Sequence, residues 1–434
     1  MSHSRKTRRV GVLTGALVLL AGCSSILDVK NPNDVPENAL DQPSAAPALM
    51  NGVVGATSRM LSAVTVPYSV ATDELDWIGS RDAWGDLETG VITNFANEFT
   101  DGAFPFVGEA RYLGDDAIRR IEKFEQDGFL KDSTVLAQTY LYTAVTYATI
   151  ADMYDDFALS SKREGKAPIG RAQMSTLYDK AVVYLTNAVT IAQAVGDADL
   201  EYQATAYRAR VKHAKGVWGK IPKGSVNIAA PLVNDAGANA DATAAITLKP
   251  GDTKFTLDNN VEANAGINIW FEVNGRNEHR TGTVYRNLVD PVTAVKDSGM
   301  IARLKEFTDF GTQSGTFTLT SNRELRLILA EAALAANDIA TFTTQINAVR
   351  TLDKRPIWAG TPAAQAILVY ERQSQLWLMR RRLSDMYRFN LKAVEWKVHP
   401  VYESAFNVGG LLFPIANVER LSNVCIAEPS SAGC

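Results

Sequence analysis

Apolar residues recur at helical spacing through four segments in the first half of the chain. These segments cover about 110–127, 132–153, 175–195 and 200–218. In the first of them, Ala117, Ile121 and Phe124 fall on one face, and Gly128 follows as a helix stop signal. We therefore predict a helical region over about 110–220.

Helical spacing returns in the last third of the chain, over about 322–337, 341–349 and 362–383. Helices of this length that follow each other closely are typical of antiparallel hairpins. They suggest tetratricopeptide-like stacking, although the formal 34-residue consensus is not legible. We predict a mainly α fold, with a tetratricopeptide-like scaffold of helical hairpins over about 110–220 and 322–390.

The pattern changes between these regions, over about 222–321, where Gly, Asn, Asp and Thr dominate. Short alternating runs at 255–257 and 267–271 predict short strands between irregular loops. A structureless loop of about 100 residues is improbable in a compact domain. This stretch is therefore either a small subdomain or a functional insert of loops and short strands.

The N-terminus has the pattern of an export signal. A basic cluster at 5–9 precedes an apolar run at 10–21, which as a helix spans only about 18 Å and cannot cross a bilayer. The run ends in Leu-Ala-Gly-Cys, which resembles a bacterial lipobox and implies cleavage before Cys23 and lipidation of its thiol. We expect a signal peptide at 1–22 and a lipid anchor and Pro-rich tether at 23–50; the alternative is an ordinary signal peptide with an incidental Cys.

Composition excludes several classes of protein. The 434 residues are 46% hydrophobic and 21% charged, which suits a globular protein with a sizeable core. The net charge of −4 offers no electrostatic footprint for nucleic acid. Only 4 His and 3 Cys are present, so we expect neither a metal site nor a cofactor. In an exported chain, Cys425 and Cys434 favour a disulfide over two free thiols.

Seven segments, taken in order, are similar to the SusD/RagB family of outer-membrane nutrient-binding lipoproteins. They lie at 27–33, 71–74, 202–219, 322–332, 346–350, 370–388 and 412–423. The strongest is Asn-Arg-Glu-Leu-Arg-Leu-Ile-Leu-Ala-Glu-Ala at 322–332, followed by Ile-Asn-Ala-Val-Arg at 346–350. Two departures are Ala416 in place of a Pro, and a stretch at 375–379 that lacks a family Glu.

The resemblance implies a single SusD-like domain over 51–434 and a role that is not enzymatic. The implied function is capture of a nutrient oligomer, a glycan or a peptide, on the outer membrane at the cell surface. The implied partner is a SusC-like TonB-dependent transporter, on which the lipoprotein acts as a lid. The implied contact with the membrane is through the N-terminal lipid.

Two segments combine aromatic and charged residues in the way that sites for polar oligomers do. The first is 73–88, with Asp73, Trp77, Arg81 and Trp84, and the second is 267–280. The second segment contributes Trp270, Asn274 and Arg276. The alternative is that the two Trp of the first segment, seven positions apart, are core anchors on one helical face. Trp218 and Trp377 lie on predicted helices and are expected in the core.

Other charged features have structural explanations. Three consecutive arginines at 380–382 point in different directions on the predicted helix, which favours separate ion pairs over an anion site. Glu324 and Glu331 fall within the predicted scaffold. No nucleophile elbow, metalloprotease motif or phosphate-binding loop is present. The rival hypotheses are a surface hydrolase with unrecognised carboxylates and a lipid-anchored helical-repeat scaffold that binds only protein.

Overall fold

The computed structural model describes residues 37–161, 164–260, 268–308, 313–430 and 434. The predicted signal peptide, Cys23 and the tether up to residue 36 lie outside the described residues. The chain divides into two units at 1–45 and 46–434. In the first unit, the described residues form two short 3₁₀ helices, η1 (Glu37–Ala39) and η2 (Pro43–Ala45).

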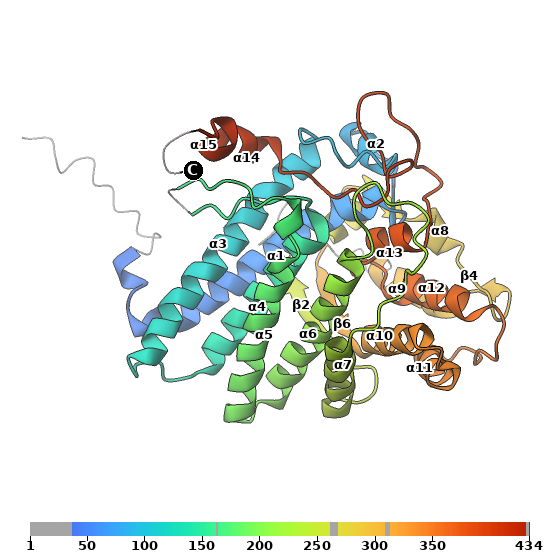
Figure 1. Cartoon of the computed structure of the whole chain (residues 1–434), viewed down its shortest axis with the longest axis horizontal. Coiled ribbons are helices and arrows are strands. Elements are labelled where there is room, and N and C mark those ends of the chain that lie inside the picture. Colours follow the sequence, from blue (N-terminus) through green and yellow to red (C-terminus); the bar gives the residue numbers. More distant parts are fainter. Residues whose placement is uncertain (1–36, 162–163, 261–267, 309–312, 431–433) are drawn as a thin grey trace, which may run out of the picture. The chain divides into compact units, whose positions relative to one another are not determined.

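Long helices form the first half of the second unit, and consecutive ones pack against each other (Figure 1). They are α1 (Ala46–Ala71), α3 (Glu98–Gln126), α4 (Thr134–Met153), α5 (Thr176–Val195) and α6 (Ala198–Trp218). The predicted helical hairpins over 110–220 are confirmed. The tether predicted up to residue 50 is wrong at its end, because α1 already begins at Ala46.

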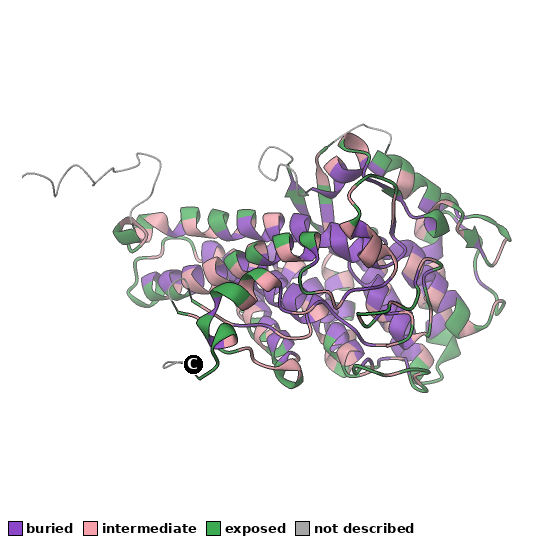
Figure 2. Cartoon of the chain, turned by 90° about the horizontal axis from the view of Figure 1, so that it is seen from above, coloured by how far each residue is buried: buried purple, intermediate pink, exposed green. Residues whose placement is uncertain are grey.

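Local sequence explains where these helices begin and end. The Asn97 side chain accepts from the backbone N–H groups of Phe99 and Thr100, which caps α3, and Asp197 caps α6 in the same way. Gly196 takes a left-handed conformation directly after α5, with φ of 73°, which glycine adopts without strain. In Figure 2 the helices carry buried residues on one side and exposed residues on the other.

The described residues of 222–321 form an insert with regular elements. It holds α7 (Ala236–Leu248), α8 (Thr283–Arg286) and α9 (Ser298–Thr308), and its strands take part in three two-stranded antiparallel pairings. The pairs join β2 (Lys254–Asn259) to β6 (Gly315–Ser321), β1 (Leu75–Trp77) to β3 (His279–Thr281), and β4 (Val289–Asp290) to β5 (Val295–Lys296).

One predicted strand of this insert is right and the other is wrong. Residues 255–257 lie within β2, as their alternating pattern predicted. The strand predicted at 267–271 is wrong over 269–271, because Ile269 and Trp270 are helical and lead into the π-helical turn η4 (Phe271–Gly275); residue 267 lies outside the described residues. The Asn268 side chain accepts from the Trp270 N–H and starts this turn.

The C-terminal helices are α10 (Asn322–Ala335), α11 (Ile339–Leu352), α12 (Ala364–Gln375), α13 (Arg382–Arg388), α14 (Asn417–Ser422) and α15 (Val424–Ala427). The single helix predicted at 362–383 is wrong: it breaks between α12 and α13. Leu378 and Arg380 take positive φ angles of 60° and 59° in this break. Arg381 and Arg382 pair separately with Asp152 and Asp73, as the ion-pair explanation predicts. The explanation is wrong for Arg380, whose two buried Nη atoms have no hydrogen-bond partner among the described residues.

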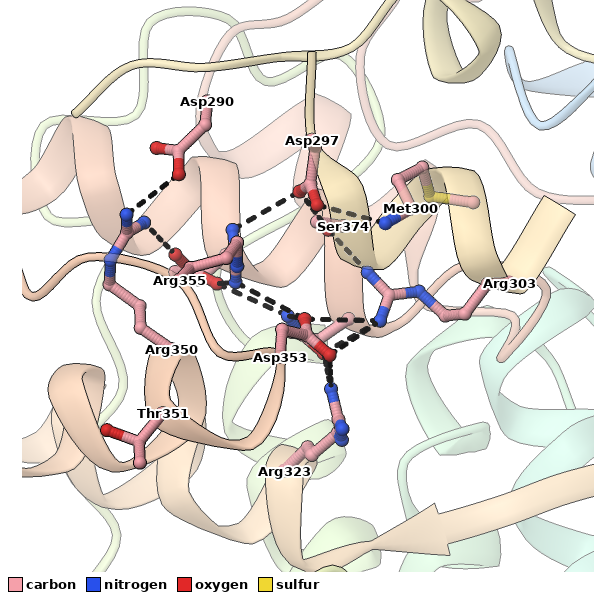
Figure 3. Close-up of polar contacts among 12 residues, drawn as sticks. Asp290, Asp297, Met300, Arg303, Arg323, Arg350, Thr351, Asp353, Arg355 and Ser374 are labelled. Atoms are coloured by element: carbon pink, nitrogen blue, oxygen red, sulfur yellow. Dashed lines mark hydrogen bonds and ion pairs between the residues drawn. The ribbon is translucent and has the colours of Figure 1, made fainter. Parts of the chain in front are cut away.

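Buried ion pairs connect the insert to the C-terminal helices (Figure 3). Arg350 lies between Asp290 and Glu371, at 2.8 and 2.7 Å, and its side chain is fully buried. Arg355 also pairs with Glu371 and with Asp297 of the insert. Since each buried charge has a partner of opposite sign, these contacts fix how the insert sits on α11 and α12.

The predicted structural roles of the scaffold glutamates agree with their contacts. Glu331 accepts from Arg388 and lies 3.1 Å from His213, while Glu324 pairs with Arg210 at 2.8 Å. At the C-terminus the structure contains a disulfide between Cys425 and Cys434, with Cα atoms 5.3 Å apart.

Candidate ligand-binding site

Two segments that the sequence singled out separately meet in one place. Strand β1 runs antiparallel to β3, with Trp77 opposite His279 and Asp76 opposite Arg280. The backbone N–H groups of Ile78 and Gly79 then both donate to the Glu278 carbonyl, at 3.0 Å. The pairing therefore brings 73–88 and the described part of 267–280 together at a single candidate site.

Arg81 lies at the centre of this site. Its guanidinium is 3.1 Å from Glu272 and 3.9 Å from Glu278, and it sits 4.6 Å from the centroid of the Phe99 ring. About a third of the Arg81 side chain remains exposed, at 31%. One cation thus links the loop before α2 (Ala83–Glu88) to both carboxylates of the insert.

Glu278 holds the loop after β1 in place. Its carboxylate accepts from Trp77 Nε1 at 3.0 Å and from the Arg81 backbone N–H at 2.9 Å. A Cβ atom at Gly79 would clash with this carboxylate, so only glycine permits the close approach. Burial raises the pKa of Glu278, but these hydrogen bonds outweigh it, and the pKa lies below its usual range.

A cavity of about 170 Å³ opens beside Arg81. Its walls come from α1, the start of α3 and the insert. The lining residues are Ser62, Ala63, Val66, Pro67, Arg81, Trp84, Glu98, Phe99, Gly102, Ala103 and Glu272. Pro67 has no N–H to donate to the Ala63 carbonyl four residues earlier, which leaves a helix carbonyl without its usual partner beside the cavity. The cavity is apolar on the α1 side and charged on the side of Arg81 and Glu272.

Several buried polar atoms at this site have no hydrogen-bond partner among the described residues. They are Trp84 Nε1, both ring nitrogens of His279, and Arg81 Nε. Burial lowers the pKa of His279 to about 3, so its ring is neutral at physiological pH. Buried polar groups usually find partners, so Trp84 Nε1 and Arg81 Nε, whose residues line the cavity, offer unused hydrogen-bonding capacity there.

Glu272 behaves differently from Glu278. Burial raises its pKa above the usual range, and Arg81 and Arg276 only partly oppose that effect. Both of its carboxylate oxygens accept from arginines, Arg81 at 3.1 Å and Arg276 at 2.9 Å. The two carboxylates are thus held by the same arginine cluster.

Two of the three predicted tryptophans are enclosed by protein. Trp84 is only 3% exposed and stacks on Phe99 with ring centroids 3.4 Å apart, and Trp270 is 7% exposed and packs against Phe307 and Phe317. Their burial fits the core role that was the alternative for Trp84, and it leaves little ring face for a ligand. Trp77 is half-buried, and its ligand role stays a prediction.

The other predicted site residues have protein partners. Asp73 forms a buried bidentate pair with Arg382, at 2.7 and 2.6 Å, below the start of β1. Asn274 donates to the Phe307 carbonyl at 2.8 Å. Arg276 is exposed, pairs with Glu272, and stays nearest to solvent of the three. Asp73 is therefore a buried structural residue beneath the site and does not lie at the surface of the site.

Some residues of the cavity were missed in the sequence. Helix α1 was not predicted, because nearly all residues from Ala56 to Ala71 are buried and no single apolar face marks the helix. Glu98 and Phe99 lie at the start of α3, about twelve residues before the predicted start of that helix. Asn97, a strong helix N-cap signal, could have located this start.

Trp218 and Trp377 were expected in the core. Trp377 is 9% exposed and packs against Phe307 and Tyr285. Trp218 is half-buried and lies against the Arg171 guanidinium, 5.2 Å from its ring centroid. The core prediction therefore holds for Trp377, and Trp218 is a surface ring covered by an arginine.

The described residues contain neither a metal-binding cluster nor a membrane-spanning helix. In the described ranges, no His, Cys, Asp and Glu side chains group in threes to hold a metal ion. None of the helices there is both long and apolar enough to cross a membrane.

Known proteins were compared by sequence and by structure. No protein-family model and no curated protein sequence matches the chain. Solved structures do match. A SusD superfamily protein from Bacteroides fragilis aligns with a TM-score of 0.62 at 14% identity, over 89% of this chain and 99% of its own. One from Bacteroides thetaiotaomicron aligns with a TM-score of 0.59 at 12% identity, over 88% and 98%.

A third structure carries a functional description. It is a SusD-like carbohydrate binding protein from Bacteroides vulgatus, which aligns with a TM-score of 0.59 at 11% identity, over 88% of this chain and 96% of its own. Each of the three alignments therefore covers most of this chain and nearly all of the solved structure. The chain has the fold of the SusD superfamily.

Proposed function

We propose that this chain is a lipid-anchored protein of the outer membrane that captures a nutrient oligomer, a glycan or a peptide, at the cell surface. We further propose that it serves as the lid of a SusC-like TonB-dependent transporter. The observation that carries the binding role is the pairing of β1 with β3, next to which Arg81 and Glu272 form an ion pair in the wall of one cavity, while Trp77 lies half-buried in β1 itself. The likeness to a SusD-like carbohydrate binding protein supports a glycan as the first ligand to test.

The chemistry of the site favours binding over catalysis. Glu272 and Glu278 have pKa values shifted in opposite directions, a pattern that acid/base pairs in hydrolases also show. However, arginine and N–H donors already occupy their oxygens. Carboxylates held in this way position a ligand's hydroxyl or amide groups better than they transfer protons.

The binding role is tested by calorimetry of the mature protein against a panel of neutral oligosaccharides and peptides. We expect Arg81→Ala and Trp77→Ala to weaken binding about tenfold each, since each removes one hydrogen-bonding or stacking contact worth about 0.5–1.5 kcal/mol. Arg119→Ala is the matched control, because Arg119 is exposed on α3 and pairs only locally with Asp116.

The outcomes separate the three hypotheses. Binding that the site variants weaken and the control does not supports capture at this site. Cleavage of any panel member would replace the proposal with a surface hydrolase. If no glycan or peptide binds, and only protein partners are retained, the chain is a helical scaffold.

The lid role needs a separate experiment. The chain is purified from its native outer membrane in mild detergent, with an affinity tag at the C-terminus. A stoichiometric TonB-dependent transporter in the eluate supports the proposal. Elution of the lipoprotein by itself, from membranes in which such a transporter is present, would contradict it.

A further inference from the structure

A second, larger cavity lies between the insert and the C-terminal helices, away from the residues of the first. Its volume is about 550 Å³. Strands β2 and β6, helix α9, the end of α11 and the break after α12 form its walls. The lining residues used below are Lys254, Arg303, Arg323, Asp353, Lys354 and Trp377.

Cations outnumber carboxylates in this wall. The lining includes four cationic residues, Lys254, Arg303, Arg323 and Lys354, and two carboxylates, Glu306 and Asp353. The formal surplus is therefore two positive charges. Asp252, just outside the wall, pairs with Arg323 at 2.8 Å and takes up one of them. The surplus is notable in a chain whose net charge is −4.

Three of these cationic groups have free donors. Neither Lys254 nor Lys354 forms an ion pair or side-chain hydrogen bond with another residue of the described ranges. Arg303 Nε is buried and likewise has no hydrogen-bond partner there. Buried donors left without a partner are costly, and a bound acceptor would satisfy this one.

The wall that carries these groups is rigid. Asp353 accepts from Arg303 at 3.3 Å and from Arg323 at 2.5 Å, and Gln375 Nε2 also donates to it at 2.7 Å (Figure 3). Ser374 accepts from Arg303 at 2.7 Å and fixes the other end of that guanidinium. The network fixes the Arg303 guanidinium through its two Nη atoms and leaves the Nε–H unbonded. This donor is therefore oriented before a ligand binds.

We propose that this cavity binds an acidic saccharide, whose carboxylate is held by Arg303 Nε and by the ammonium groups of Lys254 and Lys354. The wall also offers hydroxyl groups from Ser298 and Thr318, which suit sugar hydroxyls. Trp377 and Met379 are apolar wall residues that belong to the core, at 9% and 4% exposed. The site is separate from the one proposed at β1 and β3, so either proposal can fail without the other.

The test measures binding of trigalacturonate to the mature protein by calorimetry at low and high salt. We expect Lys254→Glu combined with Lys354→Glu to weaken binding about tenfold or more, because attraction to the carboxylates becomes repulsion. Binding by the unmodified protein should weaken as salt rises, since partly exposed charges are screened. Lys131→Glu combined with Lys397→Glu is the matched control, because both lysines are exposed and the change in net charge is identical.

Four results would overturn the proposal. Trigalacturonate does not bind at millimolar concentration, or it binds the reversal variant as well as the control. A neutral galactose trimer binds equally well, which would exclude the carboxylate as the recognised group. An acidic peptide of the same charge binds with the same dependence on Lys254 and Lys354, which would replace the saccharide. Thermal melting of both double variants, matched to the parent protein, confirms that they fold.

Discussion

Trp84 shows how one side chain can belong to a cavity and to the core together. Its indole lines the cavity beside Arg81, yet it is buried, stacked on Phe99 and edge-on to His279 at 4.5 Å. Aromatic pairs of this kind stabilise a protein beyond the area they bury. One of the three tryptophans that the sequence offered for ligand binding thus supports the groups around it.

We predict that Trp84→Ala lowers the free energy of unfolding by about 3–5 kcal/mol, because it leaves a cavity and removes the stack on Phe99. Trp84→Phe, which keeps a ring against Phe99, should cost less than half as much. Chemical denaturation of both variants measures the difference. An alanine variant as stable as the parent would mean that the indole contributes nothing to packing.

The Asp353 carboxyl makes the free energy of unfolding depend on pH. Burial by itself would raise the pKa of this carboxyl, but Arg303, Gln375 and Arg323 outweigh it and hold the pKa at about 2. The unfolded chain binds the proton near pH 3.9, so the stabilisation is present above that value and is lost as the pH falls towards 2.

We therefore predict that the free energy of unfolding falls more steeply between pH 4 and 2 in the parent protein than in Asp353→Asn. The asparagine variant is less stable at neutral pH, because Arg303 and Arg323 lose a charged partner. Urea denaturation across this pH range measures both slopes. Equal slopes would show that the arginines do not hold this carboxyl in its charged form.

At the scale of elements, the break between α12 and α13 depends on a buried carboxyl from the other end of the domain. Glu74 accepts from the Leu378 N–H at 2.6 Å, and the Trp377 indole donates to its backbone carbonyl at 3.4 Å. Leu378 and Arg380 have positive φ angles, which non-glycine residues adopt only when their surroundings impose them. Glu74 is one of the groups that impose this conformation.

Glu74 also predicts an opposite pH dependence. Burial raises its pKa to about 8, although the Leu378 N–H opposes the shift. The folded protein then keeps a proton that the unfolded chain releases near pH 4.3, so the free energy of unfolding falls as the pH rises towards 8. Glu74→Gln should remove this fall, as measured by denaturation from pH 5 to 8. The same fall in the variant would assign it to another group.

Hydrophobic periodicity predicted the helices that have a strongly apolar face. It failed where tertiary contacts determine the conformation of the backbone. Helices α4, α5 and α6 begin and end close to their predicted limits, because capping residues and apolar stripes in the sequence indicate the same limits. The break after Gln375 has no Pro or Gly to announce it, and depends on Glu74, about 300 positions away. For the candidate site, the sequence named two segments that the pairing of β1 with β3 brings together, but the partners that bury Trp84 and Asp73 come from elsewhere in the chain.

At the scale of the whole molecule, the predicted lipid anchor involves Cys23, which lies outside the described residues. We predict that Cys23→Ala leaves the protein soluble or unprocessed, because the acyl chains supply its affinity for the membrane. Fractionation of detergent-free lysates measures this, with the parent protein as control. Retention of the variant in the membrane fraction would exclude the lipoprotein prediction.

The pairing of β1 with β3 has a consequence for the order of folding. Trp77 and Glu278 are 201 positions apart, and Asp73 and Arg382 are 309 apart, so both contacts close very long loops. Contacts of such high sequence separation carry a large closure entropy and form slowly. The scaffold hairpins, built from neighbouring helices, can assemble while the chain is still emerging. The β1–β3 pairing can form only once the chain extends to residue 281, and the Asp73–Arg382 pair beneath it only once residue 382 is present, so the candidate site is completed later than the hairpins.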